Sequence, residues 1–407
     1  MRIVVHTSEP SLGAARYVFE LVRGLAEINM PVALFCPSNF EYLRELDPYG
    51  VPVFATGPRG VELNGLRVRI LRNLKFLCRA SFHQFRSTRR GDIVHFQFPV
   101  YFPFGLVFFV LAALKNCAVV FTVHDPLPHK WLLPERFRTI ERTTLKWAYK
   151  LSRRIVVHNE SGRQTLIEHF GLDPRKVSVI PHGPFSLSSA SENLPPFDRF
   201  QILLFGSIRE NKGIHLAIEA VQMLNSCPGK QVSLTIAGQV ANAREEDYWN
   251  RCKTQIEKQP EGIHVLEHYV TDAEVGRLLA NHHAVLLPYT HYASESGVAA
   301  LALSNGRAIL AMRVGGLETL LTVCHCGIAI EAPTVEGVGE AISKALRGGR
   351  PMLEQMGSEG KAFVASTRSW RGISLQTLTL YTELSSLKSG KWSTNQSPVA
   401  QQQGRDS

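Results

Sequence analysis

The chain has few cysteines, and their positions suit neither a disulfide framework nor a metal site. Seven cysteines occur in 407 residues, most of them isolated from one another. An odd, scattered set is typical of a protein from a reducing compartment. The only cluster is Cys324-His325-Cys326. A structural zinc ion needs about four ligands, usually from two such pairs, and the sequence offers no second pair, so we expect no metal.

We expect neither a secretory leader nor a membrane-spanning segment. It opens MRIVVHTSEP, which predicts a strand and a turn rather than a signal peptide. Its longest uncharged apolar stretch, residues 98–114, is interrupted by Pro99, Pro103 and Gly105 and is shorter than the roughly 20 residues that span a bilayer. We therefore interpret its second half as a buried helix and expect a cytoplasmic protein.

Acidic residues are absent between Leu63 and Gly91. The basic residues of this segment are Arg67, Arg69, Arg72, Lys75, Arg79, Arg86, Arg89 and Arg90. Leu66, Ile70, Leu74 and Leu77 recur at helical spacing. A basic amphipathic helix over 67–90 can lie on the anionic inner face of a membrane, or it can be an ordinary surface helix whose apolar stripe faces the core. The sequence leaves both readings open.

The charge balance favours anionic partners. The formal net charge is +10, which suits phosphorylated small molecules, anionic membranes or nucleic acid. We expect no nucleic-acid binding, because Phe76, Phe82 and Phe85 in the basic segment have the spacing of a buried face rather than of a platform for base stacking.

Length and periodicity predict two α/β domains. A chain of 407 residues, 44% hydrophobic, exceeds one ordinary core and suggests two domains. Strand and helix patterns alternate twice, which is typical of doubly wound, Rossmann-like parallel sheets facing across a cleft. We divide the chain into a first domain (1–183), a polar linker (184–200), a second domain (201–358), a terminal helical region (359–388) and a disordered tail (389–407). Trp370 and Tyr381 are the expected packing anchors of the helical region.

The stretch FGSIRENKG, residues 205–213, is the strongest candidate for a binding site. It follows an apolar strand and places Arg209 and Lys212 before a helix that starts near Gly213. Helix N-termini attract anions through their free N–H groups and dipole, and two cations supply further neutralisation. The pattern predicts a diphosphate site, although an exposed polar turn gives the same residues.

Other polar residues follow the predicted strands. His124 and Asp125 end one strand, where they could bind a reacting sugar or act as a core histidine and a turn cap. Glu295, Ser296 and Gly297 precede a helix, where a carboxylate could hold sugar hydroxyls or the segment could be only a cap.

Three further residues are candidates for a binding or structural role. Glu318, after a tight glycine turn, either faces the cleft or begins a helix. His182 is expected near the hinge between the domains. His95 lies within an apolar strand, and we expect a structural role for it.

Nine stretches, taken in order, resemble the family 4 (group 1) glycosyltransferases. They are SLGAARYVFEL, DIVHFQ, VFTVHDPLPH, RIVVHNES, KVSVIPHGP, FGSIRENKG, LTIAG, LLPYTHYASESGV and VGGLE, and they extend over nearly the whole chain to about residue 385. The resemblance implies the GT-B architecture and a retaining, metal-independent transfer of a hexose from a nucleotide-diphosphate sugar. It is strongest to bacterial enzymes of exopolysaccharide or lipid-linked oligosaccharide synthesis, which implies a lipid-linked or polysaccharide acceptor and no cofactor.

The resemblance also implies roles for single residues. Arg209 and Lys212 would hold the donor diphosphate, Gly13 would lie near the transferred sugar and His124 would contact that sugar. One position departs from the family, in which a second glutamate commonly binds the ribose: this chain has Leu301 there. A leucine accepts no hydrogen bond, so a non-catalytic scaffold protein of the same fold stays an alternative, as does another two-sheet enzyme such as a sugar-nucleotide epimerase.

Overall fold

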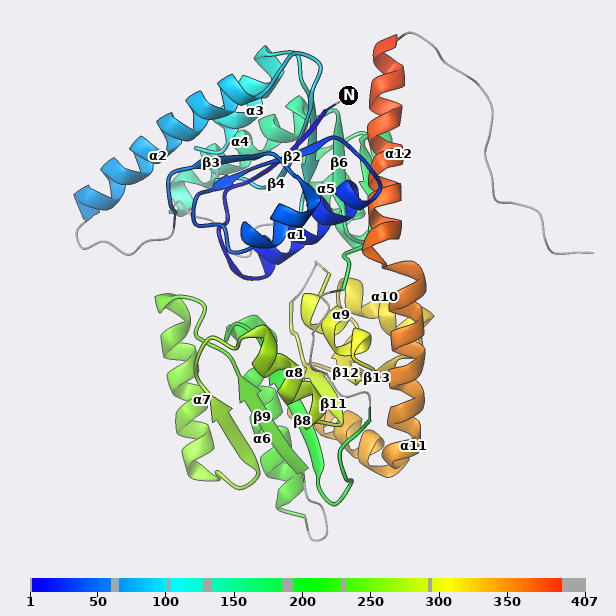
Figure 1. Cartoon of the computed structure of the whole chain (residues 1–407). Helices are drawn as coiled ribbons and strands as arrows, with labels where there is room; N and C mark the ends of the chain where they lie inside the picture. Colours follow the sequence, from blue (N-terminus) through cyan, green and yellow to red (C-terminus); the bar gives the residue numbers. More distant parts are fainter. Residues whose placement is uncertain are drawn as a thin grey trace, which may run out of the picture.

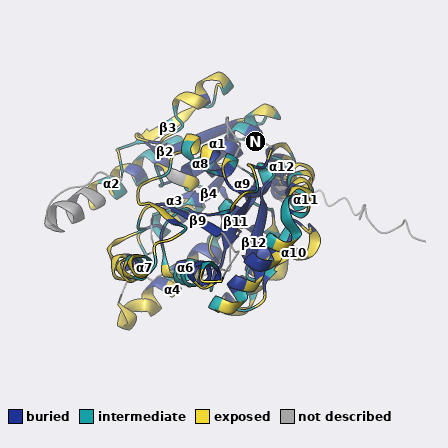
Figure 2. Ribbon diagram, turned by 90° about the horizontal axis from the view of Figure 1, so that it is seen from below, coloured by how far each residue is buried: buried dark blue, intermediate teal, exposed yellow. Residues whose placement is uncertain are grey.

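The chain forms two parallel α/β sheets, each covered by helices on both faces (Figure 1). The computed structural model describes residues 2–59, 66–100, 103–126, 134–184, 193–227, 232–291 and 295–389. The central strands of each sheet lie inside the molecule, drawn in dark blue in Figure 2, because helices cover both faces of the parallel sheets there.

The first sheet has the strand order β3-β2-β1-β4-β5-β6-β7, and all its pairs are parallel. The strands are β1 (Ile3–Thr7), β2 (Val32–Pro37), β3 (Val53–Thr56), β4 (Ile93–Phe98), β5 (Ala118–Thr122), β6 (Arg154–Val157) and β7 (Val177–Val179). Apolar runs such as IVVHT in β1 are buried along their whole length. The sequence pattern indicated each of these strands except β3, whose residues alternate between exposed and half-buried positions.

Helices on the first sheet divide into two layers. The helices are α1 (Leu12–Glu27), α2 (Leu66–Ser87), α3 (Leu106–Leu114), α4 (Arg138–Leu151) and α5 (Glu160–Phe170), with short 3-10 turns η1 (Arg44–Tyr49), η2 (Glu135–Phe137) and η3 (Pro174–Lys176). The core on one face combines α1 with residues from the end of the chain, and the core on the other combines α2, α3, α4 and α5.

The second sheet repeats the arrangement with the order β10-β9-β8-β11-β12-β13. Its strands are β8 (Phe200–Phe205), β9 (Val232–Ala237), β10 (Ile263–Leu266), β11 (Ala284–Leu287), β12 (Ala308–Met312) and β13 (Gly327–Ile330). Its helices and turns are α6 (Ile214–Asn225), α7 (Glu246–Lys258), α8 (Asp272–Ala280), α9 (Gly297–Ser304), α10 (Gly316–Val323), η4 (Glu210–Lys212) and η5 (Ala243–Glu245).

Two long helices end the described chain. We expected the terminal helical region to begin at residue 359, but α11 starts at Val335 and continues to Thr367, with a sharp bend at Gly349. Helix α12 (Trp370–Ser389) then lies along the first sheet, whereas α11 lies along the second (Figure 1). Trp370 and Tyr381 are buried in the core of the first sheet, as we expected of packing anchors. Residues 390–407 of the expected disordered tail lie outside the described chain.

Two predictions about buried helix faces are confirmed only in part: Phe76 on α2 packs against the core, and Phe108, Phe109 and Ala112 on α3 are buried, but other side chains of both helices are exposed. Phe82 and Phe85 on α2 are 65% and 43% exposed, because α2 approaches its neighbours through the smaller Ala80 and through Gln84, whose amide donates to the Phe108 carbonyl. On α3, Leu114 is 75% exposed. Spacing reveals that a helix has an apolar stripe, but not whether a neighbouring layer covers it. No helix among the described residues is both long and apolar enough to cross a membrane.

Candidate active site

The turn after β8 places two cations at the N-terminus of α6. Arg209 precedes η4, and Lys212 ends it. Gly213, in the left-handed region with φ 63°, then joins η4 to α6, and a Cβ there would overlap the Pro288 carbonyl. Gly206, with φ 102°, begins the turn and lies beside the Lys212 ammonium. The glycines therefore allow the chain to fold Arg209 and Lys212 back toward the end of the strand.

These two cations are half-buried, and among the described residues neither forms an ion pair with an acidic side chain. The Lys212 Nζ donates to the Phe205 carbonyl at 3.4 Å and lies 5.5 Å from the centroid of the Tyr289 ring. Burial, and next the nearby Arg209, lower the pKa of Lys212 to about 7. The Nε of Arg209 is buried and has no hydrogen-bond partner in the described structure. An anion bound here would receive unused donors and would favour the protonated lysine.

A cluster of aromatic and imidazole rings lies at the carboxyl ends of β5 and β6. The His124 ring stacks on Phe98 at 3.8 Å between centroids, and the edge of Tyr17 contacts it at 4.7 Å. Tyr17 also contacts His158, at 5.4 Å, and His182, at 4.9 Å. His182 thus lies beside the other two histidines, close to the segment that joins the two sheets.

Both ring nitrogens of His124 take part in a chain of hydrogen bonds. His124 Nδ1 lies 2.9 Å from His158 Nε2, and His158 Nδ1 lies 2.9 Å from the Ile180 carbonyl. On the other side, His124 Nε2 lies 3.2 Å from the Gln97 amide. The same amide lies 3.0 Å from His95 Nε2. His95 is buried in β4, in accord with the structural role expected of it.

The chain continues from His95 to the last helix. His95 Nδ1 lies 2.6 Å from the Tyr381 hydroxyl on α12, and His95 Nε2 lies 2.7 Å from the Thr122 hydroxyl. The path therefore connects α12 to His124 through the first sheet.

Donor and acceptor accounting fixes the tautomers of this chain. The Ile180 carbonyl only accepts, so His158 carries hydrogen on Nδ1, and a neutral His158 accepts at Nε2. His124 must then donate from Nδ1. If His124 is also neutral, its Nε2 accepts, and only the NH₂ group of Gln97 can donate to it. The Gln97 oxygen then faces His95, which donates from Nε2 and accepts from the Tyr381 hydroxyl at Nδ1.

The opposite orientation of the Gln97 amide requires a charged histidine. As the side chain stands, the Gln97 oxygen faces His124 Nε2, which must then carry hydrogen. In a neutral His124 ring, Nδ1 would be an acceptor, and it would face the accepting Nε2 of His158. This contact is possible only if one of the two rings is an imidazolium. Burial lowers the pKa of His124 well below the ordinary value and also lowers the pKa of His158. The hydrogen-bond arrangement with neutral histidines, in which the Gln97 nitrogen faces His124, is therefore favoured near neutral pH.

Glu295 forms a buried ion pair with Arg368. The Arg368 Nη1 lies 2.6 Å from Glu295 Oε2, and their side chains are 6% and 2% exposed. Glu295 precedes α9, whose N-cap Ser296 accepts from the Ala299 N–H. The carboxylate also lies against Gly316, where a Cβ would come 2.5 Å from Glu295 Oε1. The segment is thus a helix cap, and its carboxylate is additionally held by the residue that joins α11 to α12.

The remaining predicted residues lie at the same strand ends. Gly13 is exposed in the first turn of α1, and a Cβ added there would meet no atom within 4 Å. Asp125 is exposed and follows His124, and Gly297 is the first residue of α9. Glu318 is exposed in the first turn of α10. Among the described residues no group of His, Cys, Asp or Glu could hold a metal ion.

Sequence reasoning missed three residues of this region. Gln97, His158 and Arg368 approach His124 or Glu295 only in the folded chain, with 73 residues separating Arg368 from Glu295. For His158 there was a usable signal, because RIVVHNES ends a predicted strand in the same way as the stretch containing His124. Nothing in the sequence around Arg368 indicates an ion-pair partner.

Gln97→Glu should raise the pKa of His124. A carboxylate only accepts hydrogen bonds, so it favours hydrogens on both nitrogens of the neighbouring ring. Nitrogen NMR of histidine-labelled protein over a pH titration measures both sites directly. His6, a buried histidine outside this chain whose pKa is about 3, serves as the internal control and should not change. An unchanged His124 titration would refute the donor assignment.

Breaking the Glu295 ion pair should destabilise the protein strongly. Glu295→Gln or Arg368→Met alone leaves a buried charge without its partner and should lower the free energy of unfolding by about 3 to 5 kcal/mol. The double variant Glu295→Gln, Arg368→Met should lose less than the sum of the two, as measured by urea unfolding. Strictly additive losses would show that the two side chains do not stabilise each other.

Comparison with known proteins agrees with the two-sheet fold. The family model for Glycosyltransferase Family 4 matches residues 12–183, and the model for Glycosyl transferases group 1 matches residues 199–348. No curated protein matches the sequence. Three similar solved structures show the same fold across low sequence identity.

HepE from Anabaena in complex with UDP-glucose is 16% identical, with a TM-score of 0.72 over 94% of this chain and 100% of its own. Sucrose-phosphate synthase from Thermosynechococcus elongatus is 17% identical, with a TM-score of 0.72 over 95% of this chain and 100% of its own. The catalytic domain of starch synthase IV from Arabidopsis thaliana, bound to ADP and acarbose, is 14% identical, with a TM-score of 0.70 over 95% and 99%.

The two family models cover successive parts of the chain and the solved structures share its two-sheet architecture. The chain therefore belongs to the family 4 (group 1) glycosyltransferases, retaining enzymes of the GT-B fold that use nucleotide sugars.

Proposed function

We propose that this glycosyltransferase transfers a hexose from a nucleotide-diphosphate sugar to a lipid-linked or polysaccharide acceptor, with retention of configuration and without a divalent metal. The observation that carries the proposal is the pair Arg209 and Lys212. A buried guanidinium nitrogen without a hydrogen-bond partner and a lysine with a lowered pKa meet at one helix N-terminus. A diphosphate supplies the acceptors and the negative charge that these groups lack.

The same pair accounts for leaving-group stabilisation. During transfer, the bond between the sugar C1 and the diphosphate oxygen breaks, and negative charge grows on that oxygen. Arg209, protonated Lys212 and the N-terminus of α6 neutralise this charge in a partly buried site, the function that a metal ion has in other transferases. The acceptor hydroxyl attacks from the same face of the sugar, and its proton passes to the departing phosphate. No protein nucleophile is then required.

The other predicted residues would surround the sugar. Nothing in the protein itself requires Gly13 to be a glycine, since a Cβ there would meet open space. Close approach of the donor is a reason for its small size. We assign His124 and Asp125 to the reacting sugar, where a hydroxyl would compete with Gln97 for the accepting nitrogen of His124. Glu295 would act together with Arg368, because the two form one buried pair.

The donor loop and the two lobes complete the proposal. The N–H groups near Ser296 and Gly297, with Glu318, would contact the donor from the ends of α9 and α10. Residues 1–183 would bind the acceptor, 201–358 the donor, and 184–200 would link them, with 359–388 crossing back. HepE was crystallised with UDP-glucose, which supports a uridine-diphosphate hexose as donor.

The setting of the reaction follows from the acceptor. A lipid-linked or polysaccharide acceptor would place the enzyme in exopolysaccharide or cell-envelope synthesis, in the cytoplasm. Basic residues along 67–90 support peripheral contact with the anionic inner face of the membrane.

A non-catalytic scaffold of a polysaccharide assembly system is the second candidate. The position at which the family commonly has a ribose-binding glutamate holds Leu301, which is 7% exposed and belongs to the core of the second sheet. A buried leucine offers nothing to a ribose diol. Transfer or hydrolysis assays with a panel of nucleotide sugars decide between the candidates, and absence of binding to UDP and GDP at millimolar concentration would favour the scaffold.

UDP binding should take up protons near pH 8 through Lys212. The diphosphate favours the cationic lysine, so binding raises a pKa that lies at about 7 in the free protein, and affinity for UDP should fall as pH rises above 7. Calorimetry in buffers of different ionisation enthalpy measures this uptake.

Two variants of Lys212 separate charge from titration. Lys212→Arg should retain UDP binding but lose the proton uptake, because an arginine stays charged. Lys212→Met should lose at least tenfold in affinity and increase stability at pH 7, since a buried charge is removed. Equal UDP affinity of wild type and Lys212→Met would refute the diphosphate assignment.

Gly13→Ala should reduce transfer without destabilising the fold. A methyl group at this helical position meets no protein atom and, by removing a glycine from a helix, should leave the free energy of unfolding equal or slightly higher. The catalytic efficiency should fall about tenfold or more if the donor approaches this backbone closely. Gly24→Ala is the matched control on α1: its Cβ would overlap the Ser374 hydroxyl on α12, so stability should decrease. Full activity in Gly13→Ala would remove Gly13 from the donor site.

A further inference from the structure

Three neighbouring helices of the first lobe expose large apolar side chains. Helix α3 packs against both α2 and α4. Phe82 on α2, Leu114 on α3 and Trp147 on α4 are 65%, 75% and 51% exposed. The other exposed apolar side chains on these helices and their ends are Leu74, Phe85, Phe104, Val110, Phe137 and Ile140. We call this set, with the cations that flank it, the basic apolar face.

Cations accompany the apolar side chains along the whole face. The exposed basic residues with described side chains are Lys75, Arg79, Arg86, Arg89, Arg90, Arg136, Arg138, Arg142, Lys146 and Lys150. Several lie directly beside an exposed ring: the Lys150 Nζ is 4.9 Å from the Trp147 ring centroid, and the Arg86 Cζ is 5.9 Å from that of Phe82. Trp147 and Phe82 thus each have a charged group next to the ring.

Acidic groups on the described parts of these helices are few. Glu135 forms an ion pair with Arg138 at 3.1 Å, and Glu141 is buried. The face therefore combines apolar surface with nearly uncompensated positive charge.

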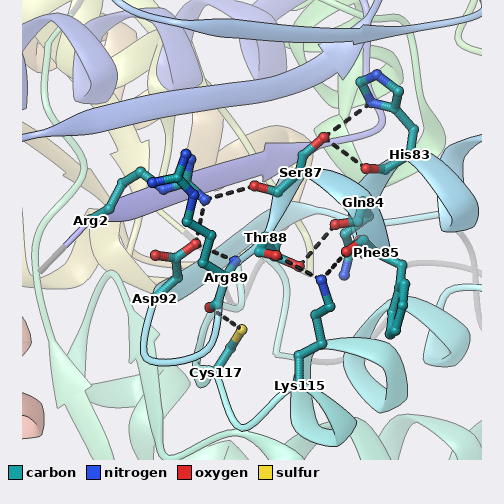
Figure 3. A network of polar contacts seen from close by, with 10 residues as sticks. All are labelled: Arg2, His83, Gln84, Phe85, Ser87, Thr88, Arg89, Asp92, Lys115 and Cys117. Carbon is teal, nitrogen blue, oxygen red and sulfur yellow. Dashed lines mark hydrogen bonds and ion pairs between the residues drawn. The ribbon is translucent and has the colours of Figure 1, made fainter.

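The basic apolar face is held firmly at the end of α2. Figure 3 shows the Arg2 guanidinium donating to the Ser87 carbonyl at 2.6 Å and to the Asp92 carboxylate at 2.5 Å. Lys115 donates to the Thr88 carbonyl at 2.8 Å, which ties the end of α2 to the turn after α3. These hydrogen bonds fix the end of α2 to the sheet, and Phe82 and Phe85 are exposed on this fixed helix.

We propose that the basic apolar face docks the protein on an anionic lipid bilayer. Apolar side chains such as Leu114 and Trp147 would enter the headgroup region, while lysine and arginine side chains extend to lipid phosphates. This goes beyond a basic segment at 67–90, because α3 and α4 supply most of the aliphatic side chains and an aromatic anchor.

Other occupants fit the face less well. The core of a protein interface is depleted of charge, whereas lysines and arginines are distributed among the apolar side chains here. Single-stranded nucleic acid would use the cations, but leucine, isoleucine and valine offer no ring on which a base can stack. An anionic membrane satisfies both the charge and the aliphatic surface.

The inference rests on the proposed function only in one respect: a lipid-linked acceptor would lie at the same surface. Vesicle binding itself needs neither donor nor acceptor. The protein can therefore bind vesicles even if it does not catalyse the proposed transfer, and it can catalyse the transfer without binding vesicles.

Sedimentation with phosphatidylcholine vesicles, with and without one third phosphatidylglycerol, tests the proposal on the full chain. We expect at least tenfold stronger binding to the anionic vesicles. Lys146→Glu with Lys150→Glu should reduce that binding tenfold or more, since each cation near the surface contributes substantially. Arg277→Glu with Lys344→Glu, which makes the same charge change at exposed sites of the second lobe, should bind as the wild type does. All variants should retain UDP affinity.

Fluorescence locates the contact. Of the tryptophans described, Trp147 is exposed, and Trp249 and Trp370 are buried. Trp131 and Trp392 lie outside the described residues. Anionic vesicles should shift emission to shorter wavelength, and Trp147→Phe should reduce the shift while binding persists. Equal loss of binding in both double variants, or no preference for anionic lipid, overturns the proposal. Binding of an oligonucleotide at the same ionic strength, or self-association, without vesicle binding would also overturn it and identify the other occupant.

Discussion

The buried ion pair between Glu295 and Arg368 is the interaction on which the arrangement of the two lobes depends. Arg368 lies at the junction of α11, which covers the second sheet, and α12, which packs into the core of the first. Its partner Glu295 immediately precedes Ser296, the N-cap of α9, at the carboxyl edge of the second sheet. The charges of this pair also act on His158, at the edge of the first sheet. This pair therefore anchors the junction of α11 and α12 to the segment before α9, and a second ion pair, between Arg16 on α1 and Asp272 on α8, joins the two lobes directly.

Buried positive charge is the second constraint, and it opposes the first. An ion pair such as Glu295 and Arg368 cancels its own charge, whereas Lys212 and Arg209 face each other with like charges, so burial costs stability until an anion arrives. Such a site is destabilising alone and favourable when occupied. The free energy that the empty fold loses at Lys212 is recovered on binding, which makes the same residues unfavourable for stability and useful for affinity.

The sequence predicted most strands of both sheets, although not β3 or β13, because apolar periodicity and glycine turns are local properties. FGSIRENKG, for example, carries its strand, its turn and its helix start within nine residues. What it could not predict depends on contacts between distant segments. The role of Arg368 depends on its contact with Glu295, and the tautomer of His124 depends on its contacts with Gln97 and His158. Phe82 was misplaced for a related reason: its exposure depends on which layer covers α2, and a helical period does not contain that information.

The last helix, α12, contacts both the segment after the first sheet and the hydrogen bonds that lead to His124. Within twelve residues, Trp370 donates to the Pro184 carbonyl after the first sheet, and Tyr381 reaches His95 in the chain of hydrogen bonds that ends at His124. Gly183 must be small because the Trp370 ring occupies the space of a Cβ. Since Arg368 stands two residues before this helix, any rotation of one lobe against the other has to move α12 against His95 or strain the pair with Glu295. The donor site that we propose in the second lobe and the hydrogen-bonding state of His124 in the first are therefore connected by a covalent segment, without any need for a direct contact between them.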